Sequence, residues 1–333
     1  MLRKKIITTV LAAALALSAF AACSTDGEAA DQNAASQENR VVRIAAQSYP
    51  LYSPLDLAYD LGYVDEELNN IGVTLEWTEF ASGPLVNEAI AAGEGDLGFM
   101  ADLPAIIARS SGQDIQVVSN ISSGERSLAV LVPVDSDITD ASQLAGKRIA
   151  YAFGSYAQHL LALVLDGAGL TFDDVESVNL GAADSPTALA QGDVDAIVIW
   201  EQFITKLTLD GTARVLVDGT GIKKSNMILY AVSDYASANP DVIEALIRAI
   251  DRGIQYISSN PDDAASRLAT RYSVTPEEMN QILGNFEFYV SLSDADIQEI
   301  TTVADYAYEA GIISNPVNAD EFINTTYLTE AGF

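Results

Sequence analysis

The stretch RIAYAFGSYAQHLLALVLDGAG, residues 148–169, joins a short apolar run to a run with helical spacing through a Gly-Ser break. This pattern predicts a strand, a turn and a helix. Gly154 can adopt the positive φ that such a turn often needs, and Ser155 is a good helix N-cap. Apolar residues from Leu160 onward fall on one helical face, and we expect the helix to end near Gly167.

A strand–turn–helix junction of this kind can bind a small anion. It aims backbone N–H groups, a hydroxyl and the positive end of a helix dipole at one point. An ordinary capped α/β connection has the same sequence pattern, so this stretch alone leaves both interpretations open. The anion interpretation gains support because similar junctions recur along the chain, at residues 81–84 and at residues 184–186.

Composition limits the class of protein. With 333 residues, 49% of them hydrophobic, the chain can bury a large core and is long enough for two compact units. The formal charge of −30 makes nucleic acid an unfavourable partner. A single cysteine, Cys23, excludes an intramolecular disulfide and a multi-cysteine metal site.

The N-terminus has the pattern of an export signal. Arg3, Lys4 and Lys5 precede an apolar stretch that ends at small residues just before Cys23. We predict a signal peptide over residues 1–22 and, because residues 18–23 resemble a bacterial lipoprotein processing site, a lipid on Cys23. Cleavage by the ordinary peptidase and an uncleaved membrane anchor are the alternatives. Residues 23–40 are polar without an apolar period and predict a flexible tether.

Strand and helix patterns alternate through most of the remaining chain. Strand patterns occupy residues 41–47, 73–80, 96–100, 115–119, 128–134, 178–180, 195–200, 214–217 and 227–232, in addition to the strand that begins at Arg148. Helices are predicted between them, and from Pro240 onward the pattern is helical. Such alternation predicts an α/β fold with mostly parallel sheets, whose ligands lie beyond the carboxyl ends of the strands.

A weak internal repeat suggests two related halves. Residues 91–96 and 190–195 are similar, and each follows a helix that starts at proline and precedes an apolar strand. Duplicated lobes are the simplest explanation, with chance similarity between two βαβ units as the alternative. In both copies an acid follows the strand, Asp102 in the first and Glu201 in the second.

Signals for catalysis or for a bound cofactor are weak. His159 is the only histidine, and Ser155 is not part of a Gly-x-Ser-x-Gly elbow. We therefore interpret His159 as a packing or ligand-orienting residue. Phosphate-loop, dinucleotide-loop and zinc-ligand spacings do not occur, and residues 135–140 lack the glycine and glutamate of a calcium loop. We expect a protein that is not an enzyme and that uses no metal or cofactor.

The order of these stretches resembles a known family. The matching segments are residues 62–84, 88–105, 144–150, 154–161 and 191–201. Together they resemble the solute-binding proteins of ABC importers for aliphatic sulfonates, taurine and nitrate, the SsuA type, which have the type-2 periplasmic binding protein fold.

This resemblance implies two lobes, formed by residues 41–132 plus 232–333 and by residues 133–231, with crossings near 128–133 and 229–233. It implies a ligand cleft between the lobes. The residues carried over to that cleft are Gln47, Ser82, Gly83, Asp102, Gly154, Ser155, Tyr156, Trp200 and Glu201. Two positions depart from the family pattern: Tyr156 stands where sulfonate binders often have serine, and Glu201 stands where aspartate is commoner.

The function that the resemblance implies is capture of a small organic anion. We expect a lipid-anchored monomer on the extracytoplasmic face of the cell membrane that delivers an aliphatic sulfonate or taurine, or nitrate, to a permease and its ATPase. Asp102 and Glu201 would suit a ligand that also carries an ammonium group. The alternatives are an enzyme on the same fold, of the pyrimidine-precursor synthase or chorismate dehydratase type, and a ligand sensor for a signalling partner.

Overall fold

The computed structural model describes residues 40–333. The predicted signal peptide, Cys23 and all but the last residue of the predicted tether lie outside this range. Arg40, expected to end the tether, instead begins strand β1 (Arg40–Ala46), where its guanidinium pairs with Asp241 at 2.8 Å. Within the described range, every helix is too short or too polar to span a bilayer.

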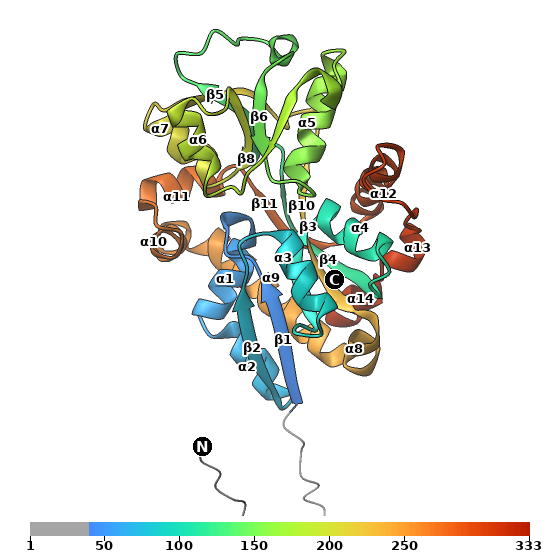
Figure 1. Ribbon diagram of the computed structural model, residues 1–333. Coiled ribbons are helices and arrows are strands. Elements are labelled where there is room, and N and C mark those ends of the chain that lie inside the picture. The colour runs from blue at the N-terminus through green and yellow to red at the C-terminus, as the bar shows by residue number, and fades with distance from the viewer. Residues whose placement is uncertain (1–39) are drawn as a thin grey trace, which may run out of the picture. The chain divides into compact units, whose positions relative to one another are not determined.

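The strands form two sheets (Figure 1). The six-stranded sheet has the order β11-β4-β10-β3-β1-β2 and the five-stranded sheet the order β7-β6-β8-β5-β9. Besides β1, the first sheet contains β2 (Val73–Glu79), β3 (Leu97–Ala101), β4 (Ile115–Gly124), β10 (Ser225–Val232) and β11 (Glu287–Ser291). The second contains β5 (Leu128–Pro133), β6 (Arg148–Tyr151), β7 (Glu176–Asn179), β8 (Ala196–Trp200) and β9 (Ala213–Asp218).

The predicted α/β class is confirmed, but the sheets are mixed and not mostly parallel. Strand β1 pairs in parallel with β2 and β3, and β6 with β7 and β8. Strands β10 and β5 run antiparallel to both of their neighbours. These two strands begin where the chain arrives from the other sheet, and they therefore run against the strands of the local βαβ units.

The chain passes between the two sheets at residues 125–127 and again at residues 219–224. These crossings differ from the predicted ones near 128–133 and 229–233, because residues 128–133 form strand β5 and residues 229–233 form the end of β10 and the first residue of α8. Strand β4 continues to Gly124 through buried polar residues such as Asn120 and Ser122. Because these residues are polar, the apolar pattern predicts a strand that ends at residue 119.

Helices cover the sheets. Those of the five-stranded sheet are α5 (Tyr156–Gly167), α6 (Ser185–Gln191) and α7 (Phe203–Leu209). The others are α1 (Ser53–Asp60), α2 (Tyr63–Asn70), α3 (Gly83–Ala91), α4 (Asp102–Ser110), α8 (Ser233–Ala238), α9 (Pro240–Ser259), α10 (Pro261–Tyr272), α11 (Pro276–Leu283), α12 (Asp294–Glu309), α13 (Ala319–Phe322) and α14 (Thr326–Ala331). Three 3-10 turns, at Pro50–Tyr52, Ala141–Leu144 and Phe172–Asp174, complete the elements.

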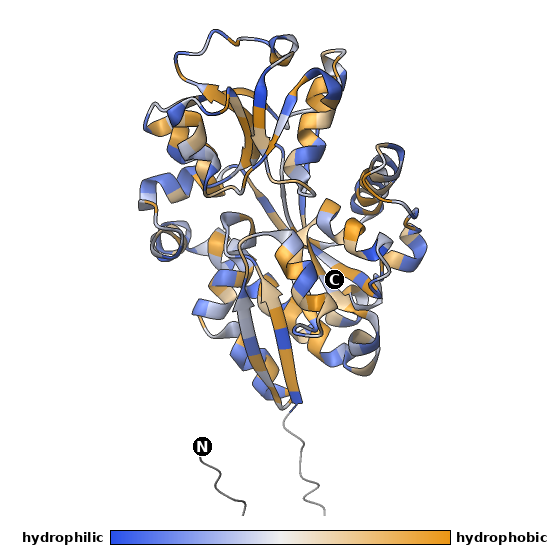
Figure 2. Ribbon diagram, in the orientation of Figure 1, coloured by the Kyte–Doolittle hydropathy of each residue, from blue (hydrophilic) through white to orange (hydrophobic). Residues whose placement is uncertain are grey.

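Apolar residues lie on the strands and on the inner faces of the helices (Figure 2). Helix α9 illustrates the pattern, because Val242, Leu246 and Ile250 are fully buried along one stripe while Arg252 is partly exposed. Each such side chain contributes roughly 1.5–3 kcal/mol when it leaves water. The stripe is therefore core packing, as its spacing predicts.

The internal repeat corresponds to a repeated network. In the first copy Asp96 accepts hydrogen bonds from the backbone N–H of Arg43 at 2.9 Å and from its guanidinium at 2.6 Å. In the second, Asp195 accepts from the backbone N–H of Arg148 at 2.8 Å and from its guanidinium at 2.9 Å. The arginines occupy the first parallel strand of each sheet, so the two networks support the interpretation of duplicated halves.

Candidate ligand-binding site

The turn before α5 forms as predicted, but the hydroxyl of Ser155 does not cap the helix. Gly154 has a φ of 72°, and Ser155 occupies the N-cap position in an extended conformation. The Ser155 hydroxyl donates to the carbonyl of Ala152 at 2.6 Å and does not cap the helix. Backbone N–H groups in the first turn of α5 therefore lack a capping side chain within the described residues.

A second helix start comes from the six-stranded sheet. Ser82 is the N-cap of α3, also extended and without a side-chain cap. Gly83 packs so closely against α4 that an added Cβ would lie 2.8 Å from Cγ of Pro104. Only glycine fits at this contact, because a real Cβ does not approach a neighbouring atom this closely.

The two helix starts line one small cavity of about 20 Å³, which is room for about one water molecule. Its lining residues are Gln47, Tyr49, Leu51, Tyr52, Ser82, Gly83, Ala101, Pro104, Ser155, Tyr156, Trp200 and Met227. Six of the nine predicted site residues are therefore brought together, namely Gln47, Ser82, Gly83, Ser155, Tyr156 and Trp200. None of the twelve lining residues carries a formal charge.

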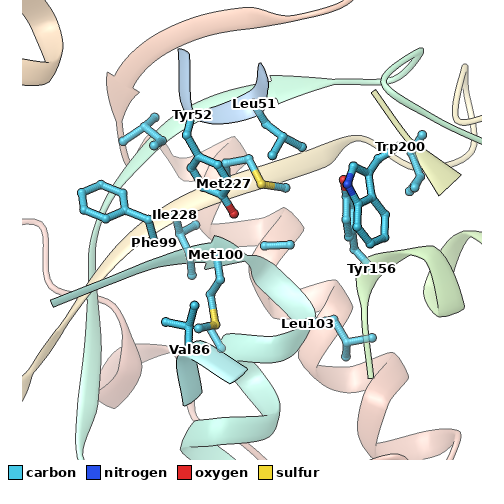
Figure 3. Packing of buried hydrophobic residues seen from close by; sticks show 14 of the residues in the cluster. Leu51, Tyr52, Val86, Phe99, Met100, Leu103, Tyr156, Trp200, Met227 and Ile228 are labelled. Atoms are coloured by element: carbon cyan, nitrogen blue, oxygen red, sulfur yellow. The ribbon is translucent and has the colours of Figure 1, made fainter. Parts of the chain in front are cut away.

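Aromatic rings form one wall of the cavity. The rings of Tyr156 and Trp200 lie side by side, with centroids 5.4 Å apart (Figure 3). Tyr49 meets Trp200 edge to face at 5.9 Å. Opposite the ring pair, Figure 3 shows Leu51 and Met227. The lining is therefore suited to a ligand with an apolar part.

Two residues of this wall carry hydrogen-bond donors that are unused. Trp200 Nε1 and Tyr156 Oη are buried and have no partner within residues 40–333. Indole nitrogen can only donate, and burial raises the pKa of Tyr156 well above its ordinary value, so that its hydroxyl keeps its proton. Tyr52 Oη already donates to Gln47 Oε1 at 2.9 Å. An unused buried donor is costly, which makes these two groups candidates for an acceptor-rich ligand.

Asp102 does not line the cavity. Its carboxylate is fully buried and pairs with the ammonium of Lys223 at 3.1 Å, and it also accepts from the backbone N–H of Leu103 at 2.7 Å. Lys223, on the crossing segment between β9 and β10, is buried as well. The structure therefore gives the Asp102 charge a partner inside the protein.

Glu201 and Gly154 also lie outside the cavity. The buried Glu201 carboxylate accepts from Thr205 N at 3.0 Å, from Thr205 Oγ1 at 2.8 Å and from Asn285 Nδ2 at 2.7 Å. Burial raises the pKa of Glu201, and these hydrogen bonds oppose that effect. Gly154 lines an adjacent groove. The sequence-based reason for expecting an ammonium on the ligand, two free acids in the cleft, is therefore wrong.

His159 is a packing residue in the structure. Its ring stacks on that of Tyr306 with centroids 4.0 Å apart, and it does not line the cavity. Burial, with a smaller effect of Lys223, lowers the pKa of His159 to about 2. Because His159 lies outside the cavity and its lowered pKa makes it a weak base, it is not placed to act as a general base on a ligand there.

Sequence reasoning missed half of the lining. Tyr49 and Tyr52 follow the first strand, and their position beyond a strand end was a usable signal. The sequence did not predict that Met227 lines the cavity or that Lys223 pairs with Asp102. Both contacts depend on how the second crossing packs against the end of β3.

The family model named NMT1/THI5-like matches residues 50–264. A protein of Escherichia coli K12 named for aliphatic sulfonate binding is 31% identical over 235 residues, 68% of this chain and 73% of that one. A Bacillus subtilis protein with the same name is 26% identical over 315 residues, 94% and 93% of the two chains.

The taurine-binding periplasmic protein of Escherichia coli is 31% identical over 217 residues, 62% of this chain and 66% of that one. Among solved structures, the alkanesulfonate-binding protein SsuA of Xanthomonas axonopodis bound to MOPS superposes with a TM-score of 0.80 at 27% identity, over 86% of this chain and 98% of that one. One relative is an enzyme, the 4-amino-5-hydroxymethyl-2-methylpyrimidine phosphate synthase of Aspergillus parasiticus, at 24% identity over 79% of this chain and 80% of that one.

Proposed function

Because the chain belongs to the NMT1/THI5-like family, we propose that it is the substrate-binding protein of an ABC importer and captures an aliphatic sulfonate between its two sheets. The observation that carries this proposal is the pair of unused donors, Trp200 Nε1 and Tyr156 Oη, which belong to two residues that line the cavity. A sulfonate offers three oxygen acceptors that share one charge. Charge-assisted hydrogen bonds contribute roughly 1.5–3 kcal/mol each, so a few of them supply micromolar affinity without an arginine.

The cavity lining favours an alkyl sulfonate over the two other predicted ligands. Taurine carries an ammonium, and no carboxylate among the lining residues would pair with it. Nitrate has no apolar part, whereas the carbon next to a sulfonate group would contact Leu51, Met227 and the aromatic wall. Binding without catalysis is favoured over the activity of the enzyme relative, because no histidine, cysteine, lysine or carboxylate lines the cavity.

Delivery to a permease requires that the ligand can enter and leave. A cavity of about 20 Å³ is smaller than a sulfonate with its alkyl group, so the elements that enclose it separate to admit the ligand and then close on it. We assign this motion to the two crossing segments, residues 125–127 and 219–224. The two halves, each built on one sheet, act as the lobes that open and close.

The same proposal places the protein on the extracytoplasmic face of the membrane, as a monomer held by a lipid on Cys23. A single acyl chain gives only marginal anchoring, so more than one chain is required. Mass spectrometry of the N-terminal peptide from membranes tests this part. An unmodified peptide that begins after Cys23 would contradict it.

The test of the function uses calorimetry with ethanesulfonate, taurine, nitrate and a pyrimidine as ligands. We expect ethanesulfonate to bind most tightly. Trp200→Phe and Tyr156→Phe each keep an aromatic ring at the position and remove one donor, and each should weaken ethanesulfonate binding about tenfold or more.

Trp77→Phe is the matched control. Trp77 is the other tryptophan of the chain, it does not line the cavity, and its Nε1 donates to Glu79 Oε1 at 3.1 Å. This variant should bind like the wild type. Equal affinity of all three variants and the wild type for ethanesulfonate, or binding of the pyrimidine alone, would reject the proposed function.

A further inference from the structure

An open groove of about 380 Å³ lies beside the cavity, between helices α3 and α4 and the turn that precedes α5. Its apolar lining residues are Pro84, Pro104, Ile107, Ala108 and Phe153. The side chain of Phe153 is 44% exposed, which is unusual for a phenylalanine and leaves an apolar surface in contact with water.

The groove adjoins the cavity. Pro104 lines both of them, and the pairs Gly83–Pro84 and Gly154–Ser155 each contribute one residue to the cavity and one to the groove. The turn lies next to α4 here, since a Cβ on Gly154 would be in van der Waals contact with Cδ1 of Ile107, at 3.6 Å. A ligand held at the two helix starts therefore has the groove as its nearest apolar space.

The volumes of the cavity and the groove suit different parts of the ligand. The cavity of about 20 Å³ holds about one water molecule and takes the anionic head only when the halves separate, so it has no further room for an alkyl chain, whereas the groove of about 380 Å³ has room for one. We propose that the groove binds the apolar tail of an organosulfonate whose head lies in the cavity, an inference that rests on the proposed function. Ile107 and Phe153 then determine which tail lengths the protein prefers.

The polar part of the groove restricts the tail further. It consists of Asn87, Ser111 and Gln113, all uncharged. Asn87 Nδ2 donates to the carbonyl of Pro104 at 2.7 Å, and Gln113 Nε2 to the carbonyl of Asn87 at 3.3 Å, so the amide donors are in use. No charged group lines the groove, and a second anion at the far end of the tail would have no partner there. The preferred substrates are monosulfonates with a neutral tail.

The test compares the affinities of methanesulfonate, butanesulfonate and octanesulfonate, and of butane-1,4-disulfonate, for the whole protein by calorimetry. Each methylene that enters the groove should tighten binding about fourfold. Phe153→Ser and Ile107→Ser should each reduce the preference for octanesulfonate over methanesulfonate about tenfold and leave the affinity for methanesulfonate unchanged.

Phe333→Ser is the control, because Phe333 is 47% exposed and lines a different cavity. It should leave the preference intact. If methanesulfonate binds and affinity does not rise with chain length, or if all three variants behave alike, the inference fails while the proposed function stands. Tight binding of the disulfonate also overturns the inference, and the absence of any sulfonate binding overturns both.

Discussion

Asp102 follows a strand as a ligand-binding carboxylate would, and yet its partner is Lys223. Both side chains are almost fully buried, at 0% and 1% exposure. Taking two charges out of water is costly, and in this geometry each compensates the other. Residue type and position in the sequence were therefore sufficient to place Asp102 near the cleft, but not to assign its role, because the lysine is 121 residues away.

This assignment predicts a stability defect for Asp102→Asn. The change leaves the Lys223 ammonium buried without a counter-charge and should lower the free energy of unfolding by about 3–5 kcal/mol in urea denaturation. The double variant with Asp102→Leu and Lys223→Met should recover most of this loss. A variant that is as stable as the wild type but has lost its sulfonate affinity would instead make Asp102 a ligand residue.

The lowered pKa of His159 predicts that the stability of the protein depends on pH. Its pKa is lowered to about 2 in the folded protein, from about 6.5 in the unfolded chain, so the unfolded state binds more protons between these values. The part of the unfolding free energy that depends on a neutral His159 is complete above pH 6.5. It is lost as the pH falls, by at most about 1.4 kcal/mol per pH unit.

The variant His159→Phe keeps a ring against Tyr306 and removes the titration. The difference in unfolding free energy between wild type and variant, measured by urea denaturation at several pH values, should shift in favour of the variant as the pH falls from 6.5 to 4.5. Taking the difference cancels other groups, such as Asp56, whose pKa burial raises to about 7. A difference that is constant with pH would show that His159 titrates in the folded protein as it does in the unfolded chain.

At the scale of elements, local patterns predicted most starts and ends. Thr275 caps α11 through its side chain, as the Thr-Pro signal predicts. Asn239 precedes Pro240 in the same kind of signal, and α9 begins there, although the Asn239 side chain makes no cap hydrogen bond. Proline at the first helical position was the more reliable part of the signal, because it fixes φ whatever the preceding side chain does.

Sheet membership could not be predicted in this way. Strand β10 has an apolar run like that of a strand in either sheet, and its place between β3 and β4 depends on pairing with residues about a hundred positions away. The ion pairs of Arg43 and Arg148 with their aspartates could not be predicted either. The sequence showed the repeated glycine and aspartate, but the arginine of each network lies on another strand.

At the scale of the whole folded part, residues 40–333, the two halves meet around the cavity. Contacts between them include the stack of His159 on Tyr306 at 4.0 Å and the edge-to-face contact of Tyr49 with Trp200 at 5.9 Å. A third is the hydrogen bond from Asn285 to Glu201 at 2.7 Å. Because the proposed function requires the halves to separate, these contacts set the balance between open and closed forms.

The Asn285–Glu201 hydrogen bond gives the last prediction. Neither residue lines the cavity, so Asn285→Ala removes a contact of the closed form and leaves the ligand's own contacts in place. A buried hydrogen bond to a carboxylate contributes roughly 1.5–3 kcal/mol, and the loss falls mainly on the closed form, because water replaces the amide when the halves separate. Ethanesulfonate should therefore bind about tenfold more weakly and dissociate faster in stopped-flow measurements. Asn280→Ala, an exposed position on α11, should bind normally. An unchanged dissociation rate in Asn285→Ala would mean that this contact persists in the open form, and the proposed separation at the crossing segments would have to be placed elsewhere.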